Sequence, residues 1–493
     1  MGFAPPERIV VAADRRVRKR ADYVLYWMIA ARRPSVNFAL DHALAHARAL
    51  ELPLLVFEPL RAGYRWASDR LHRFVLDGMA ANAASFAAAG VTYFPYVEPS
   101  PGAGRGLLAA LAERAAVVVT DQQPGFFQPR MVTAAALKID ARLEVIDSVG
   151  LLPLAMHGRA FPTAASFRWH WQKIIAPHLA VGPDTRPLSR LPRALLGAEL
   201  PAAILTRWPA ATAPLLAGVG LDQLPIDHAV RPVDYRGGHV VGAKVVSRFI
   251  AARLASYHEA RNQPELEVAS GLSPYLHFGH VGVHAVAHAV WDDAEWTPTQ
   301  LAGQRANGSR DGWWGLPPAA ESFMDELLTW REVGHGFCHY RDDFDRYEAL
   351  PGWARNSLDA HASDPRPHCY RLDELEHAAT HDPLWNAAQR QLVAEGRIHN
   401  YLRMLWGKKI LEWSPSPRAA LAALIELNNK YAVDGRDPNS YAGIFWTLGR
   451  FDRPWGPERP IFGVIRYMSS DNTARKVRVK RYLAQWSAQP TLL

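Results

Sequence analysis

The sequence predicts an α/β N-terminal domain with a doubly wound parallel sheet, followed by an all-α C-terminal domain. Short buried strand patterns alternate with Ala- and Leu-rich helical patterns over the first 160 residues, which favours a parallel sheet. Repeated prolines interrupt any long helix over residues 175–240. From residue 242 onward, apolar residues recur at helical spacing. We therefore expect domains at 1–160 and 242–493, joined by an interdomain linker at 161–241.

Five short apolar stretches in the first part are predicted to be the strands of the sheet. They lie at residues 23–28, 54–57, 91–94, 117–120 and 143–146. No Gly-x-Gly-x-x-Gly pattern follows the first of them, so a classical dinucleotide site is not expected there.

Composition restricts the compartment and the partners. The net charge of +8 suits a polyanionic partner, although charge alone is weak evidence for one. Cys338 and Cys369 give neither a disulfide framework nor a zinc spacing, so we expect a reducing compartment and no metal site. No apolar run reaches 18 residues and the Arg-rich start lacks the apolar core of a signal peptide. We expect a cytoplasmic protein without membrane spans.

Two consecutive helices are predicted around residues 382–413. Asp382 and Pro383 form a helix start, with a capping carboxylate followed by a proline whose φ suits the first turn. In the next helix, Trp406 and Trp413 are seven residues apart, which places them on one face at a rise of roughly 10.5 Å. Arg403 lies on the same side and requires a carboxylate or a bound anion. The nearest candidate carboxylates are Asp434 and Asp437.

Four motifs in the C-terminal half occur in a familiar order. They are HDPLWNAAQ at 381–389, RMLWGKKILEW at 403–413, DGRDPN at 434–439 and RPIFGVIRYM at 459–468. Together they resemble the flavin-binding helical domain of the photolyase and cryptochrome family, and most closely the class II cyclobutane pyrimidine dimer photolyases. The resemblance extends over about 257–468, and more loosely over the N-terminal part.

The resemblance implies FAD bound within the helical domain. The segment SGLSPYLHFG at 270–279 is similar to the family's flavin-phosphate motif, and a Ser-Pro helix start offers N–H groups to phosphate. Ala269 stands where the family often has Thr, and Asn400 where many class II chains have Gly. The implied FAD contacts are Tyr257, Ser270, Leu272, Ser273, Arg331, Asn400, Arg403, Asp434 and Asp437, with Asn428 facing flavin N5.

The implied reaction is light-driven electron transfer from reduced FAD to a cyclobutane pyrimidine dimer that has left the DNA stack. Glu326 and Trp330 are one turn apart on a predicted helix at 323–333, and the resemblance places both at the lesion. A protonated Glu326 would stabilise charge arriving on the base. By resemblance, Trp406 and Trp385 form an electron relay toward the flavin, with Trp413 as a side branch.

UV-damaged DNA containing pyrimidine dimers is the implied partner. The implied DNA and lesion contacts, besides Trp330, are Trp446, Arg453, Trp455, Arg459 and Arg466. The basic run at 475–481 suits a phosphate contact and a solvated surface equally. The family's N-terminal domain can hold a second, antenna chromophore, often a deazaflavin or a folate, and its presence here is left open. We expect a monomer, associated with the nucleoid if the source is bacterial.

Other interpretations predict different measurements. A cryptochrome-like photoreceptor would bind the same flavin without repairing DNA. A (6-4) photoproduct enzyme would need histidines at the lesion, and the sequence around His335 and His339 does not resemble that group. A structural module without flavin would be colourless when purified. Between the motifs, residues 293–320 are Gly-rich and aperiodic, and we expect a mobile surface loop there.

Overall fold

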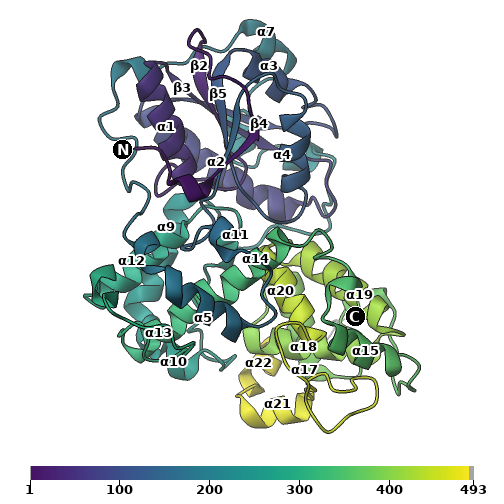
Figure 1. The fold of residues 1–493 in the computed structure, drawn as a ribbon. Coiled ribbons are helices and arrows are strands. Elements are labelled where there is room, and N and C mark those ends of the chain that lie inside the picture. The colour runs from purple at the N-terminus through teal and green to yellow at the C-terminus, as the bar shows by residue number, and fades with distance from the viewer. Residues whose placement is uncertain (1, 488–493) are drawn as a thin grey trace. The chain divides into compact units, whose positions relative to one another are not determined.

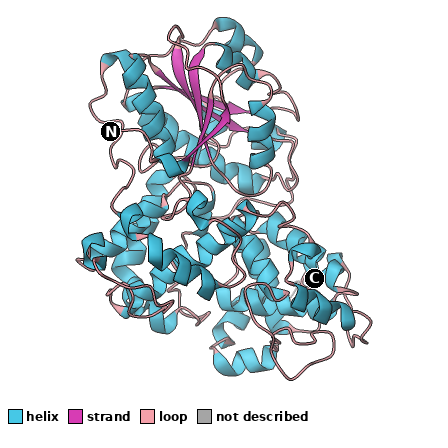
Figure 2. Cartoon of the chain, in the orientation of Figure 1, coloured by secondary structure: helices cyan, strands magenta, loops and turns pink. Residues whose placement is uncertain are grey.

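The computed structural model describes residues 2–487, whose contacts form two compact units (Figures 1 and 2). The first unit comprises Met1–Gly158, Ile174–Ser247 and Gly271–Ala302; the second comprises Arg159–Lys173, Arg248–Ser270 and Gly303–Leu493. This division differs from the three expected ranges, because the segment expected as a linker contributes to both units. Within the second unit, Arg168 forms a buried two-point ion pair with Asp325 at 2.8 and 2.9 Å.

A six-stranded sheet with helices on both faces forms the core of the first unit (Figure 2). Its strands are β1 (Ile9–Ala13), β2 (Tyr23–Trp27), β3 (Leu54–Leu60), β4 (Thr92–Val97), β5 (Ala115–Asp121) and β6 (Leu143–Ile146). The strand order is β1-β6-β5-β2-β3-β4, and all neighbours except β1 and β6 are parallel. The predicted doubly wound fold is confirmed, and β2 lies at the point where the strand order reverses.

Alternation along β2 explains the two layers of helices. Leu25 belongs to an apolar cluster that includes Leu107 of α3 (Leu107–Glu113), whereas Tyr26 belongs to a separate cluster that includes Leu40 of α1 (Phe38–Leu50). Because successive side chains of a strand point to opposite faces, each face of the sheet is covered by its own helices.

The edge strand β1 was not predicted. Its residues run antiparallel to β6, with Ile9 opposite Ile146, and the first part of β1 is partly exposed. Its sequence, IVVAA, is an apolar run like those of the five predicted strands, although it lies at an edge where only one side is paired. The sheet is therefore mixed rather than wholly parallel.

The remaining elements of the first unit are helices, the longest of which has 20 residues. They are η1 (Pro6–Arg8), α2 (Asp69–Ala88), α4 (Gln128–Ala136), η2 (Leu154–His157), α6 (Ala176–Leu179), η3 (Arg193–Leu195), α7 (Ala202–Arg207), α8 (Ala213–Leu216), η4 (Leu221–Gln223), α11 (Ser273–His277), α12 (Val283–Asp293) and η6 (Pro298–Leu301). Helix α9 (His239–Ala252) crosses the boundary between the units. The prolines of the 175–240 segment limit its helices to six residues or fewer.

The regular elements of the second unit, over its described residues, are helices joined by loops. Its elements are α5 (Ala164–Ile174), η5 (Leu254–Ser256), α10 (Tyr257–Ala260), α13 (Pro318–Met324), η7 (Asp325–Trp330), α14 (Arg331–His339), η8 (Tyr347–Ala349), α15 (Gly352–Ala360), α16 (Leu372–Glu376), α17 (Pro383–Glu395), α18 (Asn400–Trp413), α19 (Pro417–Tyr431), α20 (Pro438–Thr447), α21 (Ser470–Lys476) and α22 (Lys480–Gln485). The two predicted helices at 382–413 are confirmed, and α17 ends at Gly396 in the left-handed conformation.

The helix expected over 323–333 is present, within a continuous helical segment formed by α13, η7 and α14. Its middle part, η7, is π-helical, so residues 325–330 do not follow the spacing of an α-helix. One local expectation was wrong. The region expected to be a mobile surface loop contains Trp313 and Trp314, which are 2% and 3% exposed. Both pack on Trp171 of α5, with ring centroids 5.0 and 5.5 Å away. Over residues 2–487 no helix combines the length and hydropathy needed to cross a bilayer.

Candidate functional site

Three buried tryptophans from α17 and α18 form a continuous array in the second unit. Trp385 and Trp406 stack with an interplanar angle of 1° and centroids 6.5 Å apart. Trp413 meets Trp385 edge to face at 5.5 Å. The carboxylate of Asp382 accepts the backbone N–H of Trp385 at 3.0 Å, which fixes Trp385 in the first turn of α17. Trp385 therefore lies between the other two indoles, at spacings over which an electron can move.

Each indole N–H of the stacked pair has a partner. Trp385 Nε1 donates to the carbonyl of Trp406 at 3.0 Å, and Trp406 Nε1 donates to Oε1 of Gln389 at 2.9 Å. A buried indole needs such an acceptor, and these two bonds fix the rings relative to each other. The sequence prediction missed Gln389, although a glutamine one turn after Trp385 on a buried helix face indicated a polar partner.

Arg403 and Asp434 form the ion pair that the sequence predicted. Nη2 lies 3.5 Å from Oδ1, and the two side chains are 24% and 14% exposed. Asp434 starts the DGRDPN turn, which packs closely against the end of α19. A Cβ at Gly435 would lie 2.7 Å from the carbonyl oxygen of Asn428, so this approach requires glycine. The turn thus holds Asp434 close to the backbone of Asn428.

The second aspartate of the same turn caps a helix. Oδ1 of Asp437 accepts the N–H of Asn439 at 2.8 Å, and Pro438 occupies the first position of α20. Arg436 adopts the left-handed conformation, with φ of 69°, and its N–H donates to Oδ1 of Asn429 at 2.9 Å. The structure therefore gives Asp437 a capping role in addition to the ligand contact that the resemblance implied.

The other implied cofactor residues are distributed over both units. Asn428 is buried, and its Nδ2 donates to Oδ1 of Asn429 at 3.1 Å. Asn400 is exposed at the start of α18, and Arg331 is buried at the start of α14. Ser270 belongs to the second unit, whereas Leu272 and Ser273 belong to the first.

Glu326 is held by a cation that the sequence prediction did not assign to the site. Nη1 of Arg261 forms an ion pair with Oε1 of Glu326 in the π-helical stretch η7. The guanidinium also lies over the ring of Tyr257, 5.8 Å from its centroid. Burial raises the pKa of Glu326 above its usual value, and the lowering effect of Arg261 only partly offsets it. Arg261 lies four residues after Tyr257, and nothing in this spacing indicates Glu326 as its partner.

The predicted DNA contacts include a compact cluster of indoles and cations, here called the indole–arginine cluster. It consists of Trp446, Trp455, Arg453 and Arg466, with Asp452 as its carboxylate. Arg466 lies 4.0 Å from the ring centroid of Trp455 and 5.5 Å from that of Trp446. Its Nε is 3.0 Å from Oδ2 of Asp452, whose Oδ1 accepts the indole N–H of Trp455 at 3.0 Å. Such a surface offers both stacking faces and positive charge.

Arg459, by contrast, lies over Tyr467 at 5.1 Å from its ring centroid. The basic run at 475–481 alternates charged exposed residues with the buried Val477 and Val479. Arg481 in this run forms an ion pair with Glu265 at 3.3 Å. The run therefore docks through its valines and exposes its cations.

Lys408 is a further residue of this region that the sequence prediction did not single out. Its side chain is fully buried, Nζ donates to the carbonyl of Thr447 at 2.6 Å, and Nζ lies 4.9 Å from the ring centroid of Trp446. Burial lowers the pKa of Lys408 to about 7, with Asp452 opposing and Arg466 adding to the shift. Lys408 follows Trp406 by two residues, which is not the spacing of one helix face, so the sequence did not indicate a buried cation here.

Comparison with known proteins identifies the family. No protein-family model matches the chain. A deoxyribodipyrimidine photo-lyase of Methanothermobacter thermautotrophicus is 33% identical over 465 residues, covering 94% of each chain. One of the same name from Oryza sativa subsp. japonica is also 33% identical, over 94% of this chain and 87% of its own length.

Solved structures show the same fold at lower identity. A bacterial class III photolyase from Agrobacterium tumefaciens superposes with a TM-score of 0.65 at 17% identity, covering 94% of this chain and 86% of its own. A cryptochrome from Synechocystis gives a TM-score of 0.68 at 16% identity, with 94% and 88% covered. At such identities the likeness establishes the fold alone. The near-complete alignments at 33% identity establish more: this chain belongs to the deoxyribodipyrimidine photo-lyase family.

Proposed function

We propose that this chain is a DNA repair enzyme that uses blue or near-UV light to split cyclobutane pyrimidine dimers, and that it is of the class II type. The observation that carries the proposal is the alignment over 94% of the chain with relatives named deoxyribodipyrimidine photo-lyase. The motifs of the helical region support the class II assignment, since they match that class in order and spacing. We further propose that the chain acts as a monomer in the cytoplasm, on chromosomal DNA.

The polar groups of the second unit suit FAD. Arg403 and Asp434 place a positive and a negative charge side by side, and the buried Asn428 lies against the same turn. A flavin ring carries donors and acceptors along one edge and apolar surface elsewhere, so charge and carboxamide groups on one side match it. When bound, FAD supplies the light-driven electron. The residues of this chain bind and orient the ring, and Trp385, Trp406 and Trp413 provide the path by which it is reduced.

Lesion recognition is assigned to Glu326 and the indole–arginine cluster. A damaged base pair loses less stacking energy on leaving the duplex than an intact one, so extrusion favours the lesion. The cationic and aromatic surface around Trp446 and Trp455 would hold phosphates and unstacked bases. A protonated Glu326 would donate a hydrogen bond to a pyrimidine carbonyl, and burial shifts the pKa of this carboxyl group in the direction that favours the protonated form.

A second chromophore, a deazaflavin or a folate, would bind in the first unit. Parallel sheets bind ligands at the carboxyl ends of their strands, beside the point where strand order reverses. There the loop after β3 brings Tyr64 to within 6.0 and 5.7 Å, between ring centroids, of Phe126 and Phe127 after β5. These partly exposed rings offer a flat aromatic surface to a planar pigment.

The function is tested with purified protein and UV-irradiated thymine oligonucleotides. We expect a yellow protein whose reduced form removes dimers under blue light and not in darkness, measured by chromatography of the products. A yellow protein that leaves dimers intact would indicate a photoreceptor, and a colourless one would contradict the flavin assignment.

Glu326→Gln should retain FAD and lower the repair yield per absorbed photon severalfold, because an amide cannot supply the acidic proton. Arg261→Gln is the matched variant: it breaks the same ion pair but leaves the carboxyl group in place, so its repair yield should stay closer to the parent value. Equal yields in parent and Glu326→Gln would remove the proposed role of the carboxyl group. The measurement is dimers split per photon, on protein whose FAD content has been confirmed by absorbance.

Arg466→Ala should weaken binding of dimer-containing DNA and reduce the slope of log affinity against log salt by about 1, the value for one phosphate contact. The alternative is that Arg466 only supports Trp455 and Trp446. In that case affinity falls while the salt slope is unchanged. Arg371→Ala, which removes an exposed arginine paired with Asp373, serves as the control and should leave both quantities unaltered.

A further inference from the structure

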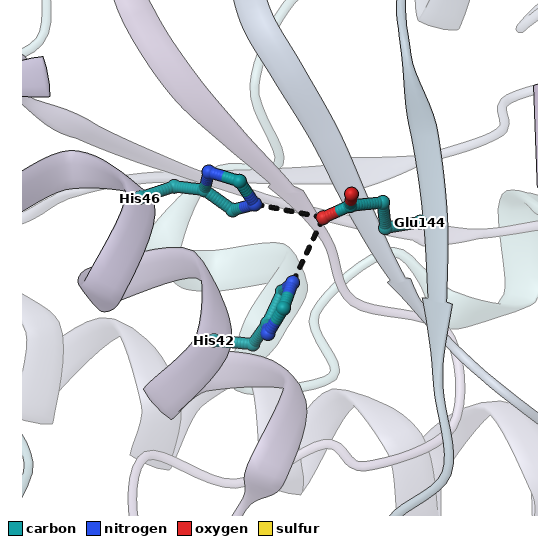
Figure 3. A group of neighbouring side chains, drawn as sticks. All are labelled: His42, His46 and Glu144. Carbon is teal, nitrogen blue, oxygen red and sulfur yellow. Dashed lines mark hydrogen bonds and ion pairs between the residues drawn. The ribbon is translucent and has the colours of Figure 1, made fainter. Parts of the chain in front are cut away.

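A second polar cluster lies in the first unit and has no part in the proposed repair reaction (Figure 3). His42 and His46 of α1 both direct Nε2 at one carboxylate oxygen of Glu144 on β6, at 2.8 and 2.7 Å. The three side chains are 3%, 12% and 7% exposed. Over residues 2–487 this is the only group of three or more His, Cys, Asp or Glu side chains whose ligand atoms all lie within 4.8 Å of one another.

The donor set is that of a divalent transition metal. Histidines at i and i+4 lie on one face of a helix, which is the spacing by which a single helix supplies two imidazole ligands to zinc. A carboxylate from another element completes a His₂Glu set, which leaves one of four tetrahedral positions open. Metal–ligand bonds of about 2.0–2.2 Å place tetrahedral ligands roughly 3.4 Å apart. Each Nε2 now lies 2.8 or 2.7 Å from the carboxylate oxygen, so binding an ion requires these atoms to separate by about 0.6–0.7 Å, a shift that side-chain rotation can supply.

The surroundings orient the carboxylate and leave room for positive charge. Arg142 Nε donates to the other oxygen, Oε1, of Glu144 at 2.5 Å, so Oε2 alone faces the imidazoles. Arg142 is also paired with Asp14 at 2.7 Å. The carboxylates of Asp14 and Glu144 therefore share one guanidinium, which leaves a net negative charge that a metal ion could balance. Burial raises the pKa of Glu144, but the hydrogen bonds from His42, His46 and Arg142 reverse this, and the pKa lies well below the usual range. The carboxylate is therefore ionised at neutral pH, as a metal ligand must be.

We propose that His42, His46 and Glu144 form a binding site for one Zn²⁺ ion, or a divalent ion of similar chemistry, that joins α1 to the edge of the sheet. No spacing in the sequence indicates this site, because the histidines and Glu144 are about a hundred residues apart. Helix packing against β6 brings the ligands together.

The geometry also couples this site to the start of the chain. The backbone N–H of Ala4 donates to Nδ1 of His42 at 3.1 Å, so without a metal the ring proton resides on Nε2. Coordination through Nε2 moves that proton to Nδ1. Nδ1 then carries a hydrogen that faces the Ala4 N–H, and it can no longer accept a hydrogen bond from that group. The hydrogen bond is then lost. Phe3, whose ring meets both imidazoles edge to face at 5.2 and 4.9 Å, must shift with it. Metal binding and docking of the N-terminal residues therefore oppose each other.

The site is tested on full-length protein without a histidine tag, freed of metal and titrated with Zn²⁺ against a chromogenic chelator. We expect one ion per chain, and an affinity at least about tenfold lower in His46→Ala and in Glu144→Gln, since losing even an outer-shell partner costs 10- to 100-fold. His288→Ala is the matched control. It disrupts the His284 and His288 pair of α12, which has the same spacing without a carboxylate, and should bind as the parent does. Absence of stoichiometric binding, or binding unchanged in both ligand variants, overturns the proposal.

A measurement on the parent protein does not depend on how the variants fold. Hydrogen–deuterium exchange of the first residues should accelerate at the Ala4 amide when Zn²⁺ is added, and the acceleration should be absent in Glu144→Gln. Zinc bound adventitiously at the surface would leave this amide unchanged. An unaltered exchange rate at saturating Zn²⁺ would exclude coordination through Nε2 of His42.

Discussion

Trp406→Phe is expected to yield a folded, yellow protein whose photoreduction under blue light, with an external reductant, is slowed at least about tenfold, equivalent to 1.4 kcal/mol or more in the barrier. Phenylalanine keeps an aromatic ring in the stack with Trp385, but it is far harder to oxidise than an indole. The prediction depends on the parallel stacking of Trp385 and Trp406 at 6.5 Å between centroids. The measurement is the decay of oxidised-flavin absorbance during illumination.

In this variant photoreduction should be slowed while repair by the reduced protein is unaffected. If the flavin is first reduced chemically, the Trp406→Phe protein should split dimers as the parent does, because the indole supplies electrons only to the oxidised cofactor. Loss of the indole N–H leaves Oε1 of Gln389 without its donor, at a cost of about 1–3 kcal/mol, so thermal stability must be checked alongside. Trp353→Phe, at a half-buried tryptophan of α15 outside the array, is the control and should photoreduce at the parent rate.

The three indoles predict a graded series. Trp385→Phe should resemble Trp406→Phe, because Trp385 lies between the other two rings. Trp413→Phe should have a smaller effect, since Trp413 contacts Trp385 and lies on a side branch. Parent rates in both Trp385→Phe and Trp406→Phe would mean that these indoles serve only to pack the helices.

Local chemistry made much of the fold predictable. Asp382 with Pro383, and Asp437 with Pro438, start helices where the sequence places a capping carboxylate before a proline. The five buried strands follow from apolar runs bounded by helical patterns. The edge strand β1 is an apolar run of the same kind, IVVAA, so nothing in its composition accounts for its absence from the prediction. The π-helical stretch at 325–330 was missed because its composition is that of an ordinary helix, and only tertiary packing selects the wider turn.

The parts of the site that escaped prediction are contacts between residues distant in sequence. Arg261 and Glu326 are separated by 65 positions, and the resemblance that singled out Glu326 carried no partner for it. Trp446 and Trp455 were expected at the DNA, but Asp452, which holds Trp455 and Arg466 together, has no distinguishing neighbours in the sequence. Ion pairs between distant residues depend on how helices and loops pack. Sequence spacing predicts which side chains are neighbours only within one helix, where residues three or four apart share a face.

Lys408 offers a test of how burial at this site affects folding. Its pKa is about 7 in the folded protein against 10.5 for the unperturbed group, because its side chain is fully buried. Between these pH values the unfolded chain binds more protons than the folded one, so the free energy of unfolding rises with pH over this window. Below pH 7 Lys408 is protonated in both the folded and the unfolded protein, so the folded protein bears the full free-energy cost of burying a charged amine. At about 1.36 kcal/mol per unit of pKa, the cost of burying the charged lysine at pH 6 is about 5 kcal/mol.

Lys408→Met should therefore stabilise the protein at pH 6 and destabilise it at pH 10. The methionine removes the cost of a buried cation, but it leaves the Thr447 carbonyl without its donor at every pH, at about 1–3 kcal/mol. At pH 6 the net gain is then about 2–4 kcal/mol. Near pH 10 the cost of the buried cation has fallen to about 1 kcal/mol or less, so the loss of the hydrogen bond dominates. Denaturant unfolding from pH 6 to 10 should show the parent and variant curves crossing. Lys409→Met removes an ion pair with Glu412 at 2.7 Å and should lower stability throughout this range without a crossing. Parallel curves for parent and Lys408→Met would mean that Lys408 keeps its proton in the folded protein over this pH range. The attraction of Asp452 would then offset the lowering of the lysine pKa by burial.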